Sequence, residues 1–202
     1  VNIAFANEMA DVARQLGVNV IEAIQAASTK PFGFMPFYPG PGVGGHCIPC
    51  DPHYLLWQLR AVRARPGLVD EAMAQIAARP RQVVARAGEL LAEHGRTLAG
   101  ARVLVVGVAY KPCVRDVRES PALEIIKELQ ERGAEVSFTD EYVDEIEVPT
   151  GSMHRVHDPA NGEWDLAIVH TAHPDVDHDW LVKVPLVLDT TYRLASVDGA
   201  VL

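Results

Sequence analysis

The first part of the chain shows helical spacing interrupted by turn residues. Over residues 2–16 the apolar side chains recur three or four positions apart, which predicts one buried face of a helix. Gly17 ends this pattern, and Asn19 predicts the N-cap of a second, shorter helix. Residues 30–51 hold many of the glycines and prolines of the chain. They therefore predict an irregular segment rather than a helix or a strand.

Helical spacing resumes after this segment. A third helix is expected over residues 52–63, with Pro52 in the first turn, where a proline is tolerated. A fourth is expected over residues 68–94, and its internal Pro80 predicts a kink or a break. The pattern over residues 1–98 thus predicts an all-helical domain.

The second part of the chain alternates strands and helices. Residues 102–108 read RVLVVGV, a β-branched run that predicts a buried parallel strand. A helix capped by Ser120 is expected to extend to residue 132, whereas residues 142–163 give weak signals and predict a variable loop with a short helix. Residues 99–202 therefore predict an α/β domain, Rossmann-like and doubly wound around a parallel sheet. Its other strands are expected at residues 135–139, 165–170 and 186–189.

Composition narrows the classes of partner. The 202 residues carry a net charge of −9, which argues against a nucleic-acid surface or an anionic membrane as partner. No apolar run approaches the roughly 20 residues of a membrane span, and no signal peptide precedes the first helix. Three cysteines are too few for a disulfide framework and indicate the reducing cytoplasm. The chain begins inside a helix without a Met, which indicates a piece of a longer protein.

A glycine-rich segment, YPGPGVGGHCIPCDPH, carries the candidate chemistry. A thiolate at Cys47 would attack a carbonyl carbon, and the nearby carboxylate of Asp51 could hold a water. Cys47 and Cys50 form a CxxC flanked by His46 and His53, which leaves open a zinc site, although no second ligand pair exists. A redox pair and a plain buried cysteine are further alternatives, and the CxxC alone does not decide among them.

Three segments carry a resemblance to a known family. GPGVGGHCIPCDPHYL resembles the catalytic loop of the UDP-glucose/GDP-mannose dehydrogenase family, and NIAFANEMADVARQLGVNV resembles the start of its central helical domain. GVAYKPCVRDVRESPALEI resembles its C-terminal nucleotide-sugar domain, so the likeness covers residues 1–140 well. The resemblance implies an enzyme that oxidises the C6 alcohol of a UDP-sugar to a carboxylate, consuming two NAD.

The resemblance also implies roles for residues of the loop. Cys47 matches the nucleophile that forms a thiohemiacetal and then a thioester, and Asp51 matches the carboxylate that handles the water. Gly44 and Gly45 match backbone positions close to the sugar. Two aromatic residues fall where the loop of the family wraps the nucleotide, namely Phe37 and Tyr38.

Other positions bear on the ligands. The resemblance implies that Lys111 pairs with sugar or phosphate oxygens, and that Arg118, oriented by Asp116, reaches the NAD cofactor across the cleft. Arg193 falls where the family often has an arginine near the nucleotide. The position before Asp51 is commonly a lysine in the family. The neutral residue here resembles the branch that acts on UDP-N-acetylhexosamines, with UDP-N-acetylmannosamine favoured.

The resemblance also concerns what lies outside the chain. No GxGxxG stands at a strand-to-helix turn, so the domain that binds most of NAD is expected upstream, and the chain alone is expected to be inactive. The partners expected are a UDP-sugar and a second copy that pairs through the central helices. The alternatives are a non-catalytic module that binds UDP-sugar and dimerises, or UDP-glucose as the substrate.

Overall fold

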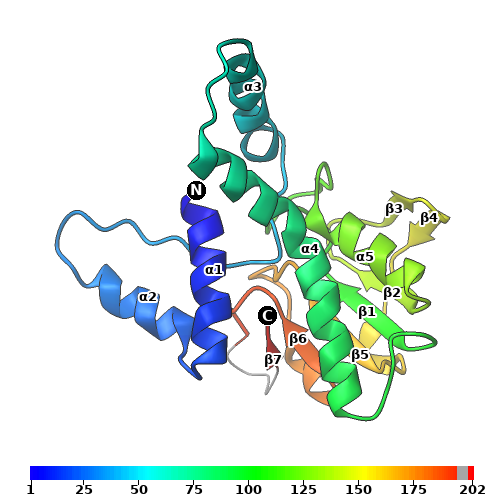
Figure 1. Cartoon of the computed structure of the whole chain (residues 1–202). Helices are drawn as coiled ribbons and strands as arrows, with labels where there is room; N and C mark the ends of the chain where they lie inside the picture. The colour runs from blue at the N-terminus through cyan, green and yellow to red at the C-terminus, as the bar shows by residue number, and fades with distance from the viewer. Residues whose placement is uncertain (195–199) are drawn as a thin grey trace.

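The structure is a computed structural model that describes residues 1–194 and 200–202. Figure 1 shows α2 and α3 extending away from the sheet, while α4 runs from the base of α3 down along the sheet. Four helices precede the first strand: α1 (Asn2–Gln15), α2 (Val20–Ser28), α3 (Cys47–Ala61) and α4 (Gly67–Glu93).

Local signals in the sequence define most helix ends. Gly17 follows α1 with a φ of +68°, a conformation that glycine adopts without strain. The Asn19 side chain accepts hydrogen bonds from the backbone N–H groups of Ile21 (3.0 Å) and Glu22 (3.3 Å). The Ser120 side chain accepts one from Ala122 at the start of α5 (Pro121–Glu131). Both predicted N-caps are confirmed.

The prediction for α3 was wrong at its start. The helix begins at Cys47 rather than at Pro52, so the last five residues of the segment expected to be irregular are helical. Pro49 lies in the first turn, where the backbone N–H has no partner within the helix, and Pro52 removes only one internal hydrogen bond. Pro80 lies inside α4, which is one continuous helix, so the alternative of a break at Pro80 is wrong; the helix changes direction along its length (Figure 1).

The second half of the chain forms a five-stranded sheet in the order β2-β1-β5-β6-β7. All neighbouring strands are parallel. The chain starts in the interior of the sheet and builds outward in both directions, which confirms the predicted doubly wound α/β fold. The strands are β1 (Arg102–Val106), β2 (Glu135–Thr139), β5 (Leu166–Val169), β6 (Val187–Asp189) and β7 (Ala200–Val201).

The segment expected to be a variable loop forms an antiparallel hairpin instead. Its strands are β3 (Glu145–Val148) and β4 (Gly151–His154), followed by the short 3-10 helix η1 (Pro159–Asn161). Gly151 has a φ of +121°, and Ile146 and Val148 turn their side chains into the core. The prediction of a loop was therefore wrong over the two strands, whereas the short helix expected in this segment is present as η1.

Two layers cover the sheet. The second half of α4 and the buried face of α5 pack on one side, and the 3-10 helix η2 (Asp179–Lys183) packs on the other with Trp164 and Trp180. The first half of α4 packs instead against α1 through Met73 and Ile76. The helix α4 is therefore a shared wall between the helical region and the sheet.

Candidate functional site

The glycine-rich loop is fixed to two helices. The Asn7 side chain of α1 accepts a hydrogen bond from the Gly40 N–H (2.9 Å), and Arg79 of α4 donates to the Gly40 carbonyl (3.1 Å). Arg79 is only 1% exposed and also pairs with Asp11 at 2.8 Å. A buried cation needs such partners, so the pair holds α1, α4 and the loop in one arrangement.

The same loop contacts the segment of the sheet domain that reads GVAYKPCVRDVRESPALEI. The Gly45 N–H donates to the Arg118 carbonyl at 3.1 Å. A Cβ added to Gly44 would lie 2.6 Å from Tyr110 Cβ and 2.9 Å from the Glu119 carbonyl oxygen, so only glycine fits there. Close packing between the two segments accounts for these glycines, and their approach to a sugar stays a prediction.

The predicted nucleophile lies at the entrance of a helix. Cys47 is the first residue of α3 and its thiol is exposed. Asp51 follows four residues later, hence one turn along the same face, and is also exposed. Both side chains are therefore accessible from solvent at the N-terminal end of α3. Neighbouring Cys50 is partly buried and offers less access to a substrate.

Three predicted ligand residues from distant segments line one cavity of about 150 Å³. Lys111 has its ammonium 5.3 Å from the centre of the Tyr110 ring, which lines the same cavity. The other walls include His170, Thr171 and Thr191, none of which the sequence singled out. Phe37, Cys47 and Asp51 are outside the described lining. The three predicted residues in the wall are Tyr38, Lys111 and Arg193.

A buried carboxylate at the end of β6 positions Arg193. Asp189 is 5% exposed and accepts hydrogen bonds from the backbone N–H groups of Arg193 and Leu194, both at 3.0 Å. Its other oxygen accepts from the N–H and the hydroxyl of Thr191. The turn after β6 is therefore held by one side chain, and the exposed Arg193 projects from it.

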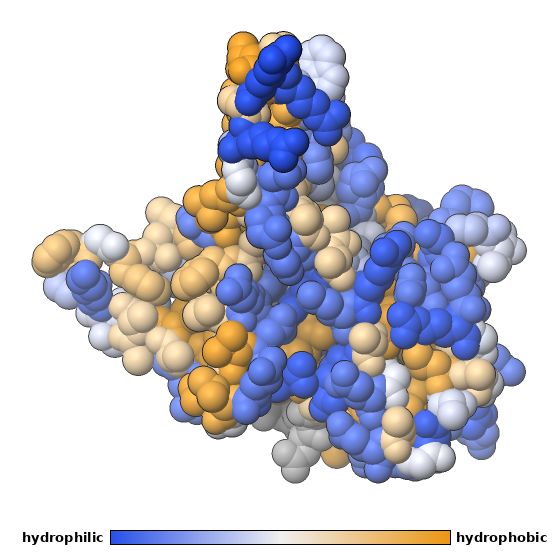
Figure 2. All heavy atoms as spheres, in the orientation of Figure 1, coloured by the Kyte–Doolittle hydropathy of each residue, from blue (hydrophilic) through white to orange (hydrophobic). Residues whose placement is uncertain are grey.

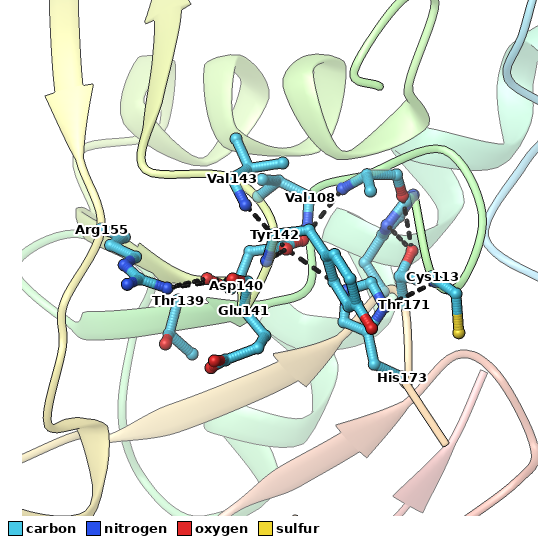
Figure 3. Close-up of polar contacts among 12 residues, drawn as sticks. Val108, Cys113, Thr139, Asp140, Glu141, Tyr142, Val143, Arg155, Thr171 and His173 are labelled. Atoms are coloured by element: carbon cyan, nitrogen blue, oxygen red, sulfur yellow. Dashed lines mark hydrogen bonds and ion pairs between the residues drawn. The ribbon is translucent and has the colours of Figure 1, made fainter. Parts of the chain in front are cut away.

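A second strand-end carboxylate organises the opposite part of the sheet (Figure 3). Asp140 follows β2 and is 4% exposed. One of its oxygens accepts hydrogen bonds from the N–H groups of Val108 (2.7 Å) and Ala109 (3.1 Å). The other accepts from the N–H groups of Tyr142 (2.8 Å) and Val143 (3.2 Å). Asp140 thus joins the turns that follow β1 and β2.

His173 completes this cluster. Its Nε2 lies 3.3 Å from Asp140, its Nδ1 accepts a hydrogen bond from the Cys113 N–H (3.1 Å), and its ring packs against Tyr142 (Figure 3). Burial alone would raise the pKa of Asp140. The hydrogen bonds from His173 and from the backbone outweigh burial and hold that pKa below its usual range. Asp140 is therefore a stable anion inside the fold.

The position of Asp140 decides what the turn after β1 can bind. In dinucleotide-binding folds the N–H groups that follow the first strand face a pyrophosphate. Here the Asp140 carboxylate accepts both N–H groups of Val108 and Ala109. A pyrophosphate would meet this anion, so the turn does not fit NAD in the usual way. Any contact of this chain with NAD has to come from elsewhere on its surface.

Arg118, which the sequence analysis predicts to reach NAD, lies elsewhere on the surface. Its guanidinium forms a forked pair with Asp116, with Nε–Oδ1 at 3.0 Å and the second nitrogen at 2.6 Å from Oδ2. The hydrogen bond from the Arg118 side chain is the main cause that lowers the pKa of Asp116 to about 2. The Arg118 side chain is still 72% exposed. It is held in place while much of its surface remains open to a ligand.

Other predictions of the sequence concern metals and membranes. Within residues 1–194 and 200–202, no group of three or more His, Cys, Asp or Glu side chains is arranged to hold a metal ion. Over the same residues, no helix combines the length and apolarity needed to cross a bilayer. Outside these groups, Lys30 lies with its ammonium 5.7 Å from the centre of the Phe32 ring.

Comparison with known proteins gives this architecture a family. Residues 1–75 match the central domain of the UDP-glucose/GDP-mannose dehydrogenase family, and residues 104–195 match the UDP binding domain of the same family. The two matches follow the order of the helical region and the sheet. The chain therefore belongs to the UDP-glucose/GDP-mannose dehydrogenase family.

Individual relatives narrow the likeness. The chain is 32% identical to the UDP-N-acetyl-D-mannosamine dehydrogenase of Methanocaldococcus jannaschii, over 94% of this chain and 43% of that protein. It is 31% identical to the UDP-N-acetyl-D-glucosamine 6-dehydrogenase of Pseudomonas aeruginosa, over 86% of this chain and 41% of that protein. The solved structure of a UDP-D-ManNAc dehydrogenase from Pyrococcus horikoshii superposes with a TM-score of 0.83 and 31% identity, covering 98% of this chain and 47% of that one. The chain spans less than half of each relative.

Proposed function

We propose that this chain is the central and nucleotide-sugar-binding part of an NAD-dependent enzyme that oxidises the C6 alcohol of a UDP-N-acetylhexosamine to a carboxylate. One observation carries the proposal. The Gly45–Arg118 hydrogen bond joins the cysteine loop to the nucleotide segment, two residues before Cys47. Beside this junction, Tyr38, Lys111 and Arg193 converge on one cavity.

The groups in that cavity suit a nucleotide sugar. Lys111 and Arg193 are exposed cations that can pair with a diphosphate, and Tyr38 offers an aromatic face. We assign the roles of Phe37, Gly44 and Gly45 in the same way, as contacts of the loop with the ligand. UDP-N-acetylmannosamine is the favoured substrate, supported by the neutral Cys50 beside Asp51 and by the relatives named above.

The proposed chemistry assigns one task to each residue. Arg118 would hold NAD from one side, a domain outside this chain would hold the rest of it, and the bound cofactor would supply the hydride acceptor for both oxidations. The Cys47 thiolate adds to the carbon of the aldehyde formed by the first oxidation and gives a thiohemiacetal. Loss of a hydride from that carbon gives a thioester. Asp51 positions the water that cleaves the thioester, which releases the carboxylate and restores the thiol.

We also propose a second copy of the chain as a partner, docked on the helical region. Figure 2 shows apolar side chains gathered over α2 and the neighbouring part of α1. Exposed apolar side chains of α1, of its C-terminal end and of the segment after α2 include Phe5, Leu16, Phe32 and Met35. Free thiols at all three cysteines fit a reducing, cytoplasmic setting. We place the division of the chain at residues 1–98 and 99–202, with α4 as the shared wall.

The decisive experiment assays the complete protein with NAD and, in turn, UDP-N-acetylmannosamine, UDP-N-acetylglucosamine and UDP-glucose. We expect two NADH for each sugar oxidised, with the highest kcat/KM for UDP-N-acetylmannosamine. Preference for UDP-glucose would overturn the choice of substrate. Binding of UDP without any NADH would overturn the enzyme and favour a non-catalytic module. Light scattering of the complete protein tests the dimer, and a monomer at all concentrations would contradict it.

A further inference from the structure

Lys111 stands on a turn that is anchored on both sides. Before it, the Ala109 carbonyl accepts a hydrogen bond from the Thr171 hydroxyl at 2.7 Å. After it, the Cys113 N–H donates to Nδ1 of His173 at 3.1 Å (Figure 3). His173 is only 2% exposed, and the chemistry proposed above gives it no task. It is nevertheless the side chain that holds the turn on the far side of Lys111.

The backbone at Cys113 needs such an anchor. Its φ of +60° lies in the left-handed region, which residues with a Cβ seldom adopt. A hydrogen bond to a buried side chain offsets the cost of this conformation. Pro112 fixes its own φ and restricts the backbone of Lys111 before it. Few free backbone torsions therefore separate the Cα of Lys111 from the hydrogen bond at Cys113.

Two neighbours hold the ring of His173 in place. Its Nε2 lies 3.3 Å from the Asp140 carboxylate, and the ring of Tyr142 packs against it with 4.8 Å between the ring centres. The Tyr142 hydroxyl donates in turn to Asp175, two residues after His173. Because Nδ1 accepts the hydrogen bond from Cys113, the ring carries its hydrogen on Nε2, beside the anion. The ring thus keeps one orientation and one tautomer.

We propose that His173 is a positioning residue which, through the Cys113 N–H, fixes the turn that presents the Lys111 ammonium to the nucleotide sugar. His173 is outside the described lining of the cavity, so it acts on the ligand through Lys111. A lysine is a point charge on a flexible stem, and its reach to a phosphate depends on where the backbone places its Cα. The inference rests on the proposed function, because it assumes that a UDP-sugar meets Lys111.

Two substitutions separate the two polar contacts of the ring. His173→Asn keeps an acceptor oxygen near the position of Nδ1, whereas His173→Gln reaches toward Asp140 and leaves the Cys113 N–H unpaired. In a calorimetric titration of the complete protein with UDP, we expect His173→Gln to raise Kd about 10-fold and His173→Asn less than about 3-fold. Equal or reversed effects would overturn the proposal. His154→Gln is the control, because that side chain is 77% exposed, and it should leave Kd unchanged.

Lys111→Ala shows whether His173 acts through Lys111, and it separates failure of this inference from failure of the proposed function. In the Lys111→Ala protein, His173→Gln should raise the Kd of UDP by less than about 2-fold, because the group that it displaces is already absent. The same loss in both backgrounds would mean a general support of the fold and would overturn the role of His173, while the site stands. If Lys111→Ala does not weaken UDP binding, the ligand does not meet this lysine, and the proposed site falls with the inference.

His173→Gln can fail to fold, so measurements on the unsubstituted protein stand beside it. Long-range proton–nitrogen NMR reports which nitrogen of the imidazole ring carries hydrogen, and amide hydrogen exchange reports the protection of the Cys113 N–H. We expect a His173 ring that carries hydrogen on Nε2 alone and a Cys113 amide that exchanges slowly. A ring protonated on Nδ1, or a Cys113 amide that exchanges as fast as an unprotected one, overturns the proposal.

Discussion

The helical region and the sheet use apolar side chains in opposite ways. In α3 no residue is buried, and Trp57 is 69% exposed. In β1 the residues from Val103 to Val106 are at most 3% exposed, and Phe138 of β2 is fully buried. Under the proposed function the two regions supply one site, with Cys47 on α3 and Lys111 beside the sheet. The difference separates residues that hold the monomer together from residues whose apolar surface is open to a partner.

The largest expected effect belongs to the exposed region. Cys47→Ser in the complete enzyme should lower acid formation by at least about 10³-fold, because no thioester can form. Since Cys47 is exposed, the free energy of unfolding should change by less than about 0.5 kcal/mol. NADH release and chemical denaturation of the same preparation measure both quantities. Undiminished acid production would remove Cys47 from the chemistry, and Cys50→Ser is the matched control.

A pair of aromatic substitutions tests the comparison of burial directly. Phe138→Ala should lower the free energy of unfolding by about 3–5 kcal/mol, because it leaves a cavity beneath α5. Trp57→Ala should change the stability of the monomer far less, since that ring is mostly exposed. Urea denaturation at low protein concentration compares the two. Equal losses would show that α3 packs within the monomer more than its exposure indicates.

Asp140→Asn tests the strand-end carboxylate. The amide introduced by the substitution would point its own N–H donors at backbone N–H groups that now donate to the Asp140 carboxylate. We therefore expect the free energy of unfolding to fall by about 2 kcal/mol near pH 7. Because the folded-state pKa of Asp140 lies below its unfolded value, its stabilisation is present above the unfolded pKa and disappears as pH falls through the folded pKa. The difference in the free energy of unfolding between wild type and Asp140→Asn should therefore stay constant from about pH 7 to pH 5. It should shrink only below about pH 3.8.

Denaturation curves at several pH values give this difference. Asp144→Asn is the control, because its side chain is 57% exposed and pairs with Arg155 near the surface. A difference that already narrows above pH 5 would contradict the assignment of Asp140 as a stable buried anion.

The smallest effect is expected at the cofactor. Arg118→Ala should weaken NAD about 10-fold and UDP-sugar less, because the guanidinium is held by Asp116 at the exposed edge of the site. KM values for both substrates of the complete enzyme measure this selectivity. Equal losses would place Arg118 on the wrong side of the cleft, and Arg115→Ala provides a nearby exposed arginine as the control.

Sequence reasoning worked where the signal is local. The caps at Asn19 and Ser120 and the strand at Glu135–Thr139 follow from neighbouring residues, and all are present. The start of α3 was not predicted because glycines and prolines usually mark irregular segments. Pro49, however, lies in the first turn of the helix, where a proline fits. The hairpin β3–β4 was missed although Glu145–Val148 alternates exposed and buried residues and Gly151 follows its turn.

The site was predictable only in part, for a physical reason. Lys111 and Arg193 stand in a recognisable pattern, and the structure places them around one cavity. The burial of Asp140, by contrast, depends on distant segments of the chain. The aspartates that directly end two strands, SFTD and LVLD, were a signal that went unused, since such residues often hold the following turn.

The hydrogen bond between the Gly45 N–H and the Arg118 carbonyl has a consequence for motion. Together with the close packing of Gly44 on Tyr110, it holds the start of α3 against the turn before α5. A hinge that separated these two segments would break that bond and expose a packed glycine surface. Substrate entry and product release should therefore leave the spacing of Cys47 and Lys111 unchanged. The opening that admits ligand has to come from movement of a neighbouring body against this unit.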